Sequence, residues 1–312
     1  MKKTIINRAD LLAHIEPYRK YLKTRSYAET TVKSSGNLIR EFFAHLEKEA
    51  VAGIHSVQRS DITAFMQKLA GRENQNHPGK GLSPAHLAKY WQALVNFDKY
   101  LQDTLQGQLC MPLERNIPQT RKQADILTEA EIRALYRACE TGRPLGLRDR
   151  AVLALYYGCG LRRREGLCLD VSDLHFERSL IHVRAGKGRR ERLVPMTRKV
   201  KNDLTLYLYQ GRPYLLGKNR ETPAFLLSER GCRPSGETID LRLKRLQQMT
   251  EENTLQAKNV SLHILRHSIA THLLQRGMNL KRIARFLGHK VLDSTQHYTH
   301  YSHGKLQRIS PQ

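Results

Sequence analysis

The feature that most constrains the fold of this chain is an interruption near its middle. Residues 105–125 read LQGQLCMPLERNIPQTRKQAD, with two prolines and without a sustained helix or strand period. Proline lacks the backbone N–H donor, so such a stretch tends to separate regular elements. Because 312 residues suffice for about two domains, we expect residues 1–108 and 126–312 to form separate domains, joined by a linker at 109–125.

The first domain is predicted to be helical. Apolar residues between Glu29 and Leu46 recur close to the helical period of about 3.6 positions. Ser83 followed by Pro84 is typical of a helix start, with an N-cap hydroxyl and a proline at the first helical position. The polar, glycine-bounded stretch 71–81 is expected to be a loop. Nothing in this half resembles a catalytic cluster, so it predicts a helical binding domain.

The second domain is predicted to combine helices with a small β-sheet. Thr128 and Glu131 match the capping box of a helix start, and a second helix is expected from about Leu147 to Tyr157. Two β-prone segments flank a glycine-rich tip, which predicts a hairpin. The hairpin strands are 180–183 and 193–195, and further helices are expected from Glu237 onward, at 261–276, 280–287 and 294–302. The fold class is therefore mainly α with a small sheet.

The chain carries a strong positive charge. Lys and Arg total 53 against 29 Asp and Glu, so the formal net charge is +24. A polyanion would neutralise such a compact chain, with nucleic acid the first candidate and an anionic membrane surface the second. No stretch approaches the ~20 consecutive apolar residues that a membrane-spanning helix needs. We therefore expect double-stranded DNA as the partner and no membrane.

The cysteines and the N-terminal residues indicate the cellular compartment in which the protein acts. The five cysteines are an odd number without a CxxC pair, which argues against a disulfide framework or a zinc ribbon. Met1-Lys2-Lys3 resembles the charged start of a signal peptide, but Asn7–Asp10 breaks the apolar region that should follow. We expect a cytoplasmic, nucleoid-associated protein with free thiols.

Five short segments of the second half could carry chemistry. In chain order they contain Arg162, Lys187, the pair His263 and Arg266, then His289, then Tyr298. Each has an ordinary interpretation when taken alone: a solvated arginine run, an exposed turn, a packed tyrosine. The Walker pattern GxxxxGK[ST] is missing from the Lys187 turn, so a nucleotide site is not expected.

Histidine spacings offer metal binding as an alternative. His263 and His267 are four positions apart, as zinc ligands on a helix can be. However, Ile264 stands where the HExxH pattern requires a glutamate. Three more histidines lie within 297–303 and could form a second patch. We expect no metal and no other cofactor.

Taken together, the six residues match what phosphoryl transfer on a DNA phosphodiester requires. Negative charge gathers on the non-bridging oxygens in the transition state, and two guanidiniums can grip them bidentately. A tyrosine hydroxyl can attack in line, provided that cations or a base lower its pKa from about 10. The departing 5′-oxygen needs a proton, which a lysine or histidine can donate.

The ordered set resembles the tyrosine recombinases, or phage-integrase family. With the helical first half, the resemblance covers nearly the whole chain. The matching segments read GLRRREGLCLDVSDL from Gly160, VRAGKGRRERLVP from Val183, HILRHSIATHLLQRGMNLKRIARFLGH from His263 and STQHYTH from Ser294. We expect no arm-binding domain before the helical half, which favours a simple Xer-like or transposon-borne type.

The resemblance implies a role for each residue. Arg162 and Arg266 would clamp the scissile phosphate, and Glu165 would support them, since a buried arginine needs an orienting partner. His263 would take part in proton transfer and contact the phosphate, and His289 would donate a hydrogen bond to it.

The nucleophile and the general acid follow from the same resemblance. Tyr298 would form a 3′-phosphotyrosyl bond and free a 5′-hydroxyl, while Lys187 would protonate the leaving oxygen. Tyr301 lies three residues later, but the spacing from His289 favours Tyr298. The phosphotyrosine conserves the bond energy, so neither ATP nor metal is implied.

The implied assembly is a two-domain clamp on DNA. Four protomers, as a homo-tetramer or two related pairs, would join two recombination sites for integration, excision, inversion or dimer resolution. Two alternatives remain: a type IB topoisomerase-like nickase and a catalytically silent DNA-binding protein. The departures from the family pattern are Arg163 and Arg164, where small or apolar residues are usual, and Gly166, where a larger apolar residue is common.

Overall fold

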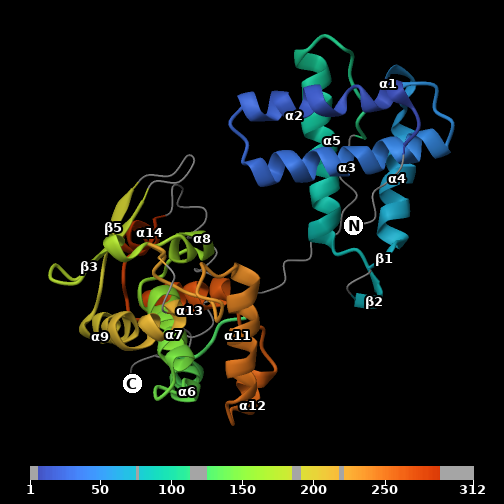
Figure 1. Ribbon diagram of the computed structural model, residues 1–312. Helices are drawn as coiled ribbons and strands as arrows, with labels where there is room; N and C mark the ends of the chain where they lie inside the picture. The colour runs from blue at the N-terminus through green and yellow to red at the C-terminus, as the bar shows by residue number, and fades with distance from the viewer. Residues whose placement is uncertain (1–5, 75–76, 113–124, 185–190, 218–220, 289–312) are drawn as a thin grey trace, which may run out of the picture. The chain divides into compact units, whose positions relative to one another are not determined.

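The computed structural model describes residues 6–74, 77–112, 125–184, 191–217 and 221–288 (Figure 1). The chain divides into two compact units, Met1–Lys122 and Gln123–Gln312. Most of the predicted linker at 109–125 lies outside the described residues. The helix expected at 294–302 lies outside them as well.

The first unit is helical. Its helices are α1 (Ala9–Leu12), α2 (Ile15–Thr24), α3 (Glu29–Lys48), α4 (Arg59–Gly71) and α5 (Pro84–Asp103), with a 3-10 turn η1 (Ile54–Ser56). Helices α2 and α3 lie side by side and α5 runs across both (Figure 1). The aromatic rings of Tyr18, Phe43 and Phe97 meet where these helices cross, and all three are fully buried.

The two helices predicted in this unit are confirmed, but the expected loop at 71–81 is wrong. Helix α5 begins as predicted, since Ser83 accepts a hydrogen bond from the His86 amide at 3.3 Å. In place of the loop, β1 (Glu73–Asn74) and β2 (His77–Gly81) form an antiparallel ribbon. Polar side chains do not prevent such a ribbon, because its ladder is made of backbone hydrogen bonds.

The second unit is mainly helical with a three-stranded antiparallel sheet, which confirms the predicted fold class. Its helices are α6 (Glu129–Ala138), α7 (Pro144–Leu153), α8 (Arg163–Leu167), α9 (Arg198–Leu206), α10 (Arg212–Leu216), α11 (Gly236–Gln248), α12 (Asn253–Gln256), α13 (Leu262–Gln275) and α14 (Leu280–Leu287). Shorter turns are the π-helices η2 (Ala154–Gly158) and η4 (Tyr207–Gly211) and the 3-10 turn η3 (Val171–Asp173).

The sheet has one strand more than the sequence predicted. Strands β4 (Leu180–Val183) and β5 (Arg192–Pro195) form the expected hairpin, and β3 (Leu174–His175) pairs with the outer edge of β4. Two residues are too short to show an alternating pattern, so β3 left no signal in the sequence. Met196 continues the hairpin by donating its amide to the Ser179 carbonyl at 2.8 Å.

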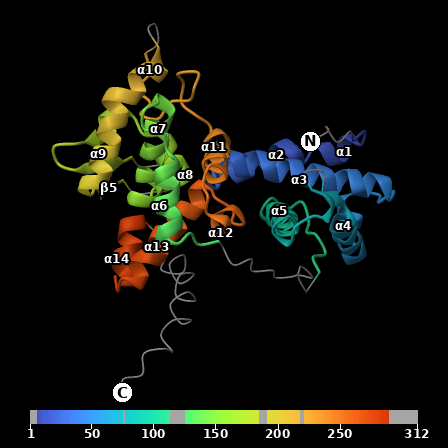
Figure 2. The same ribbon diagram turned by 90° about the horizontal axis from the view of Figure 1, so that it is seen from below.

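Helix α7 forms the centre of the second unit. Figure 2 shows it between α9 and α11, and its residues Ala151, Val152 and Leu153 are at most 2% exposed. A helix buried on all sides has no amphipathic stripe, so its start was predicted three residues too late. Pro144 at the first helical position marks the true beginning. The α7–η2 segment leads directly into residues 160–165. The buried helix therefore positions the part of the predicted site that contains Arg162 and Glu165.

Candidate active site

The site begins at a tight turn between η2 and α8. Gly160 has a φ of +59°, a left-handed conformation that favours glycine. A Cβ atom there would lie 2.7 Å from Cδ2 of Leu287, at the end of α14. The next turn places Arg162 as the N-cap of α8, and its amide donates to Oε2 of Glu165 at 2.8 Å. The glycine thus allows the turn that brings Arg162 within hydrogen-bond distance of Gly288, the residue that follows α14.

The carboxylate of Glu165 is the centre of a cluster of three arginines. Nη1 of Arg162 donates to Oε1 at 2.8 Å, and Nη1 of Arg266 lies 3.9 Å from Oε2. Arg192 of β5 binds both oxygens, with Nη1 3.0 Å from Oε1 and Nη2 2.8 Å from Oε2. The Glu165 side chain is 7% exposed. Three guanidiniums, from the N-cap of α8, from β5 and from α13, therefore share one buried carboxylate.

These arginines keep Glu165 ionised. Burial alone would raise the pKa of its carboxyl group, but hydrogen bonds from Arg192 and from the Arg162 amide, together with the charge of Arg192, outweigh it. The pKa of Glu165 falls to about 2. The carboxylate is consequently a fixed negative charge at neutral pH, and it accepts hydrogen bonds without donating any.

The same arginines bind the end of α14. Arg266 donates from Nη1 to the Gly160 carbonyl at 2.5 Å and from Nη2 to the Leu287 carbonyl at 2.8 Å. Arg162 donates from Nη2 to the Gly288 carbonyl. The last carbonyls of a helix lack intrahelical donors and favour a positive charge. The arginine cluster thus fixes the point from which the chain continues to His289.

The two predicted arginines differ in their accessibility. The Arg266 side chain is 6% exposed, whereas that of Arg162 is 22% exposed. A guanidinium has more N–H donors than the two that Arg162 uses here. The arrangement can therefore offer an incoming anion donors from Arg162 on a rigid support.

His263 lies on the same helix as Arg266. Helix α13 begins after Ser261, whose Oγ accepts from the Ile264 amide at 3.4 Å, and His263 is exposed in its first turn. His263 and Arg266 are three positions apart, so both project from neighbouring positions of one face. The ring of His263 lies 6.5 Å from that of His267, centroid to centroid. Within the described parts of the chain, no group of three or more His, Cys, Asp or Glu could hold a metal ion.

The structure brings together Arg162, Glu165 and Arg266 of the predicted residues. Lys187, His289 and Tyr298 lie outside the described residues, as does Tyr301. In the sequence, Lys187 falls between the ends of β4 and β5.

Sequence reasoning missed Arg192. The predicted strand begins one residue later, at Leu193, because arginines and a glutamate precede it in GRRERLVP. Burial along β5 alternates, so that Leu193 is exposed while Arg192 and Val194 face inward. Side chains two positions apart on a strand lie on the same face of the sheet. The spacing of Arg192 from the apolar Val194 was therefore the sequence signal that Arg192 faces inward.

Two of the departures from the family pattern, Gly166 and Arg163, have local causes. A Cβ atom on Gly166 would lie 2.6 Å from the hydroxyl oxygen of Tyr156, which donates to the Arg163 carbonyl at 2.9 Å. The Tyr156 side chain occupies the space that a larger residue would need. Arg163 pairs with Glu237 at 2.8 Å and so joins α8 to α11. Arg164 is exposed and has no ion pair with any residue between 125 and 288 that the structure describes.

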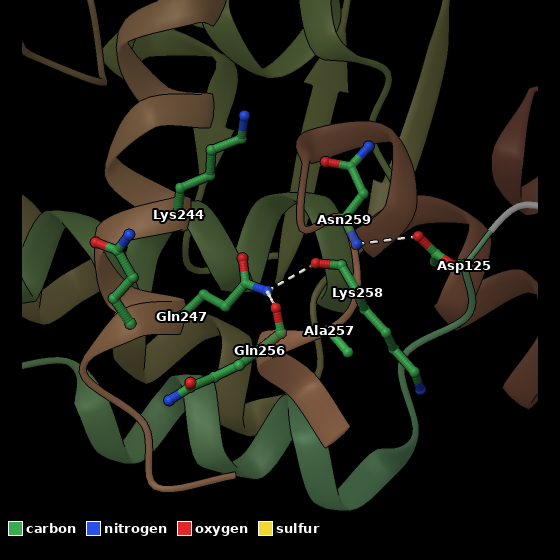
Figure 3. Close-up of a pocket in the computed structure, with 8 residues that line it drawn as sticks. Asp125, Lys244, Gln247, Gln256, Ala257, Lys258 and Asn259 are labelled. Carbon is green, nitrogen blue, oxygen red and sulfur yellow. Dashed lines mark hydrogen bonds between the residues drawn. The ribbon is translucent and has the colours of Figure 1, made fainter. Parts of the chain in front are cut away.

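A polar hollow elsewhere on the second unit is a weaker candidate. It is lined by residues at the ends of α11 and α12 and by Asp125 (Figure 3). Nε2 of Gln247 donates to the Leu255 and Lys258 carbonyls at 2.6 and 2.7 Å, and Lys258 donates to Glu131 at 2.7 Å. These groups satisfy one another, and none of the three arginines lines the hollow. The arginine cluster is therefore the candidate active site.

Comparison with known proteins identifies the family of the chain. The phage integrase family matches residues 125–304, which is more than half of the chain. The chain belongs to that family. Tyrosine recombinase XerC of Pelotomaculum thermopropionicum is 34% identical, over 96% of this chain and 97% of the relative. Tyrosine recombinase XerD of Pseudomonas aeruginosa is 33% identical, over 91% of each chain.

Solved structures support the fold. A XerH site-specific recombinase bound to its difH substrate superposes with a TM-score of 0.69 and 19% identity, over 95% of this chain and 84% of that one. The Tn1549 transposon integrase in complex with transposon right-end DNA superposes with a TM-score of 0.68 and 17% identity, over 94% of this chain and 98% of that one.

The family and its named relatives establish the activity that the sequence predicted. The chain is a site-specific DNA recombinase that uses the tyrosine mechanism. In the part of the chain that the structure describes, no helix is long and apolar enough to cross a membrane.

Proposed function

We propose that this recombinase cleaves DNA with Tyr298 as the nucleophile and Arg162 and Arg266 as the phosphate clamp. The observation that carries the proposal is the convergence of both arginines on the buried carboxylate of Glu165. Attack of the tyrosine oxygen forms a 3′-phosphotyrosyl bond and breaks the bond to the 5′-oxygen. A 5′-hydroxyl of a partner strand then reverses the step and joins the strands.

The arginines supply positive charge where the transition state is negative. Both are held by Glu165 and by backbone carbonyls, so they need little rearrangement when charge develops on the phosphate. With one carboxylate among three guanidiniums, the cluster keeps a net positive charge. That excess favours the transition state, with its greater negative charge, over the phosphodiester of the ground state.

Proton transfer falls to three further residues in this proposal. Lys187 protonates the leaving 5′-oxygen, so that its departure does not leave an alkoxide. His263, one helical turn from Arg266, contacts the phosphate and takes part in proton transfer. His289 follows Gly288, whose carbonyl Arg162 binds, and donates a hydrogen bond to the phosphate. All the groups come from the protein, so the proposal includes neither ATP nor metal.

The two units would have different roles in DNA binding and catalysis. Residues 1–108 would form the core DNA-binding domain, 109–125 the linker, and 126–312 the catalytic domain, together enclosing the duplex as a clamp. Four protomers would hold two synapsed sites, as a homo-tetramer or two related pairs. Such a protein would act in the cytoplasm, on the nucleoid. Integration, excision, inversion and dimer resolution all use this chemistry.

A nicked substrate tests the nucleophile. The cognate site is first located by footprinting the protein on DNA flanking its own gene, and a nick close to the cleavage position then traps the covalent intermediate. Denaturing gels should show a protein–DNA adduct for the wild type and for Tyr301→Phe, but none for Tyr298→Phe. If the wild type forms no adduct on a footprinted site, or if Tyr298→Phe still forms one, the proposal is wrong.

A further inference from the structure

We infer that Arg192 is a positioning residue for DNA cleavage, because it fixes Glu165 as the carboxylate that orients Arg162 and Arg266. The inference rests on the proposed function. Arg192 lies on β5, apart from Arg162 and Glu165 at the start of α8 and from Arg266 on α13. It makes a two-point contact with Glu165, since the two terminal nitrogens bind different carboxylate oxygens at 3.0 and 2.8 Å.

This contact determines the orientation of the carboxylate. A bidentate arginine defines the plane and direction of its partner more strictly than one hydrogen bond does. With both oxygens fixed by Arg192, Oε1 faces Nη1 of Arg162 and Oε2 faces the Arg162 amide, each at 2.8 Å. Without Arg192, the carboxylate could rotate away from this orientation. The guanidinium of Arg162 would then lose a fixed partner.

Packing keeps Arg192 from contacting a phosphate itself. Its side chain is 14% exposed, and both of its terminal nitrogens are directed to Glu165. A Cβ atom on Gly288 would lie 2.9 Å from Cζ and Nε of Arg192, so the Gly288 backbone covers the guanidinium. Nε is buried and has no hydrogen-bond partner among the described residues. Arg192 therefore acts through Glu165, and not as a ligand of the scissile phosphate.

The positive charge of Arg192 also helps to keep Glu165 ionised. The described charged groups that face Glu165 are Arg162 at the N-cap of the same helix, Arg192 from β5 and Arg266 from α13, while the end of α14 contributes carbonyls. The guanidinium of Arg192 contacts both oxygens of the carboxylate. Its removal leaves a buried carboxyl group with weaker compensation, so Glu165 takes up a proton at a higher pH. A protonated Glu165 no longer accepts a charged hydrogen bond from Arg162.

The test compares Arg192→Gln and Arg192→Lys in the full-length protein. Single-turnover formation of the covalent adduct on the nicked site is measured from pH 5 to 9, with DNA affinity measured in parallel. We expect Arg192→Gln to lower the cleavage rate about 10- to 100-fold while DNA affinity changes by less than about threefold. The ratio of variant to wild-type rate should fall further as the pH is lowered, because Glu165 then becomes protonated.

Repeating the Arg192→Gln substitution in a Glu165→Gln variant distinguishes a positioning role of Arg192 from a general loss of structure. In Glu165→Gln, residue 165 cannot titrate, so adding Arg192→Gln should have little further effect and no pH dependence of its own. Arg192→Lys keeps the charge and should restore the pH profile but only part of the rate. Arg184→Gln is the matched control, because Arg184 pairs with Asp170 and Asp173 at 2.8 and 2.9 Å and not with Glu165. It should cleave at the wild-type rate.

Two results would overturn the inference. One is wild-type cleavage by Arg192→Gln. The other is a loss that is equal at every pH and equal in the Glu165→Gln background, which would indicate general destabilisation. Adduct formation by the wild type and its absence in Tyr298→Phe remain the separate check on the proposed function, so the two can fail independently.

Discussion

Arg266 donates a hydrogen bond to the carbonyl of Leu287 at 2.8 Å, and Leu287 lies two residues before His289. Arg266 also binds the carbonyl of Gly160, two residues before Arg162. One buried side chain therefore connects the chain segments that lead to two other predicted site residues. Arg266 has a supporting task in the fold in addition to its proposed role at the phosphate.

Replacing Arg266 should separate catalysis from DNA binding. We expect Arg266→Ala to abolish adduct formation and largely spare affinity, because most of the affinity comes from many other phosphate contacts. The buried carbonyls of Gly160 and Leu287 would lose their donor, at about 1–3 kcal/mol for each. Gel shifts, nicked-substrate cleavage and thermal unfolding measure the three effects. Arg266→Lys retains the charge and serves as the control, and an equal loss of binding and cleavage would contradict the catalytic assignment.

The low pKa of Glu165 predicts a dependence of stability on pH. The pKa is about 2 in the folded protein, against an ordinary value of 4.5. A lowered pKa stabilises the fold fully above about pH 4.5, and this contribution is lost as the pH falls towards 2. The difference corresponds to about 3 kcal/mol. Urea unfolding at pH 7, 4 and 3 should show the wild type losing more stability than Glu165→Gln over this range; parallel losses would refute the prediction.

The sequence predicted most elements whose side chains follow a period or a cap. Helix α3 has an apolar stripe, α5 has Ser83 and Pro84 at its start, and the capping box at Thr128 forms as expected, with the Thr128 amide 2.7 Å from Glu131. Elements without such a pattern were missed. Strand β3 has two residues, and the ribbon of β1 and β2 is built from polar residues.

The site was predictable to the extent that its residues form recognisable motifs. Arg162, Glu165 and Arg266 were identified in this way, and the structure brings them together. Arg192 was not, because an arginine in a polar run normally indicates exposure to solvent. Its inward position depends on Glu165, which is 27 residues earlier in the chain. Only the folded arrangement of β5 against α8 reveals that partner.

Gly160 should not tolerate a side chain. Gly160→Ala would place an alanine at φ +59°, which costs about 1–2 kcal/mol. Its Cβ would also lie 2.7 Å from Leu287. We expect lower thermal stability and slower cleavage, because the displaced turn carries Arg162. Gly142→Ala is the matched control, since its φ is not positive and a Cβ there would meet nothing within 4 Å. Equal melting temperatures for the two variants would contradict the prediction.

Gly166 and Tyr156 should show coupled effects on stability. A Cβ on Gly166 would approach the Tyr156 hydroxyl oxygen to 2.6 Å, so Gly166→Ala should destabilise the protein by about 1–3 kcal/mol through overpacking. Tyr156→Leu removes that oxygen and also the ring carbon Cζ, which would lie 2.7 Å from the same Cβ, together with the 2.9 Å hydrogen bond to the Arg163 carbonyl. In the Tyr156→Leu background, Gly166→Ala should therefore cost less than in the wild type. Unfolding of the four proteins of this double-mutant cycle measures the coupling, and strict additivity would show that the two residues do not compete for space.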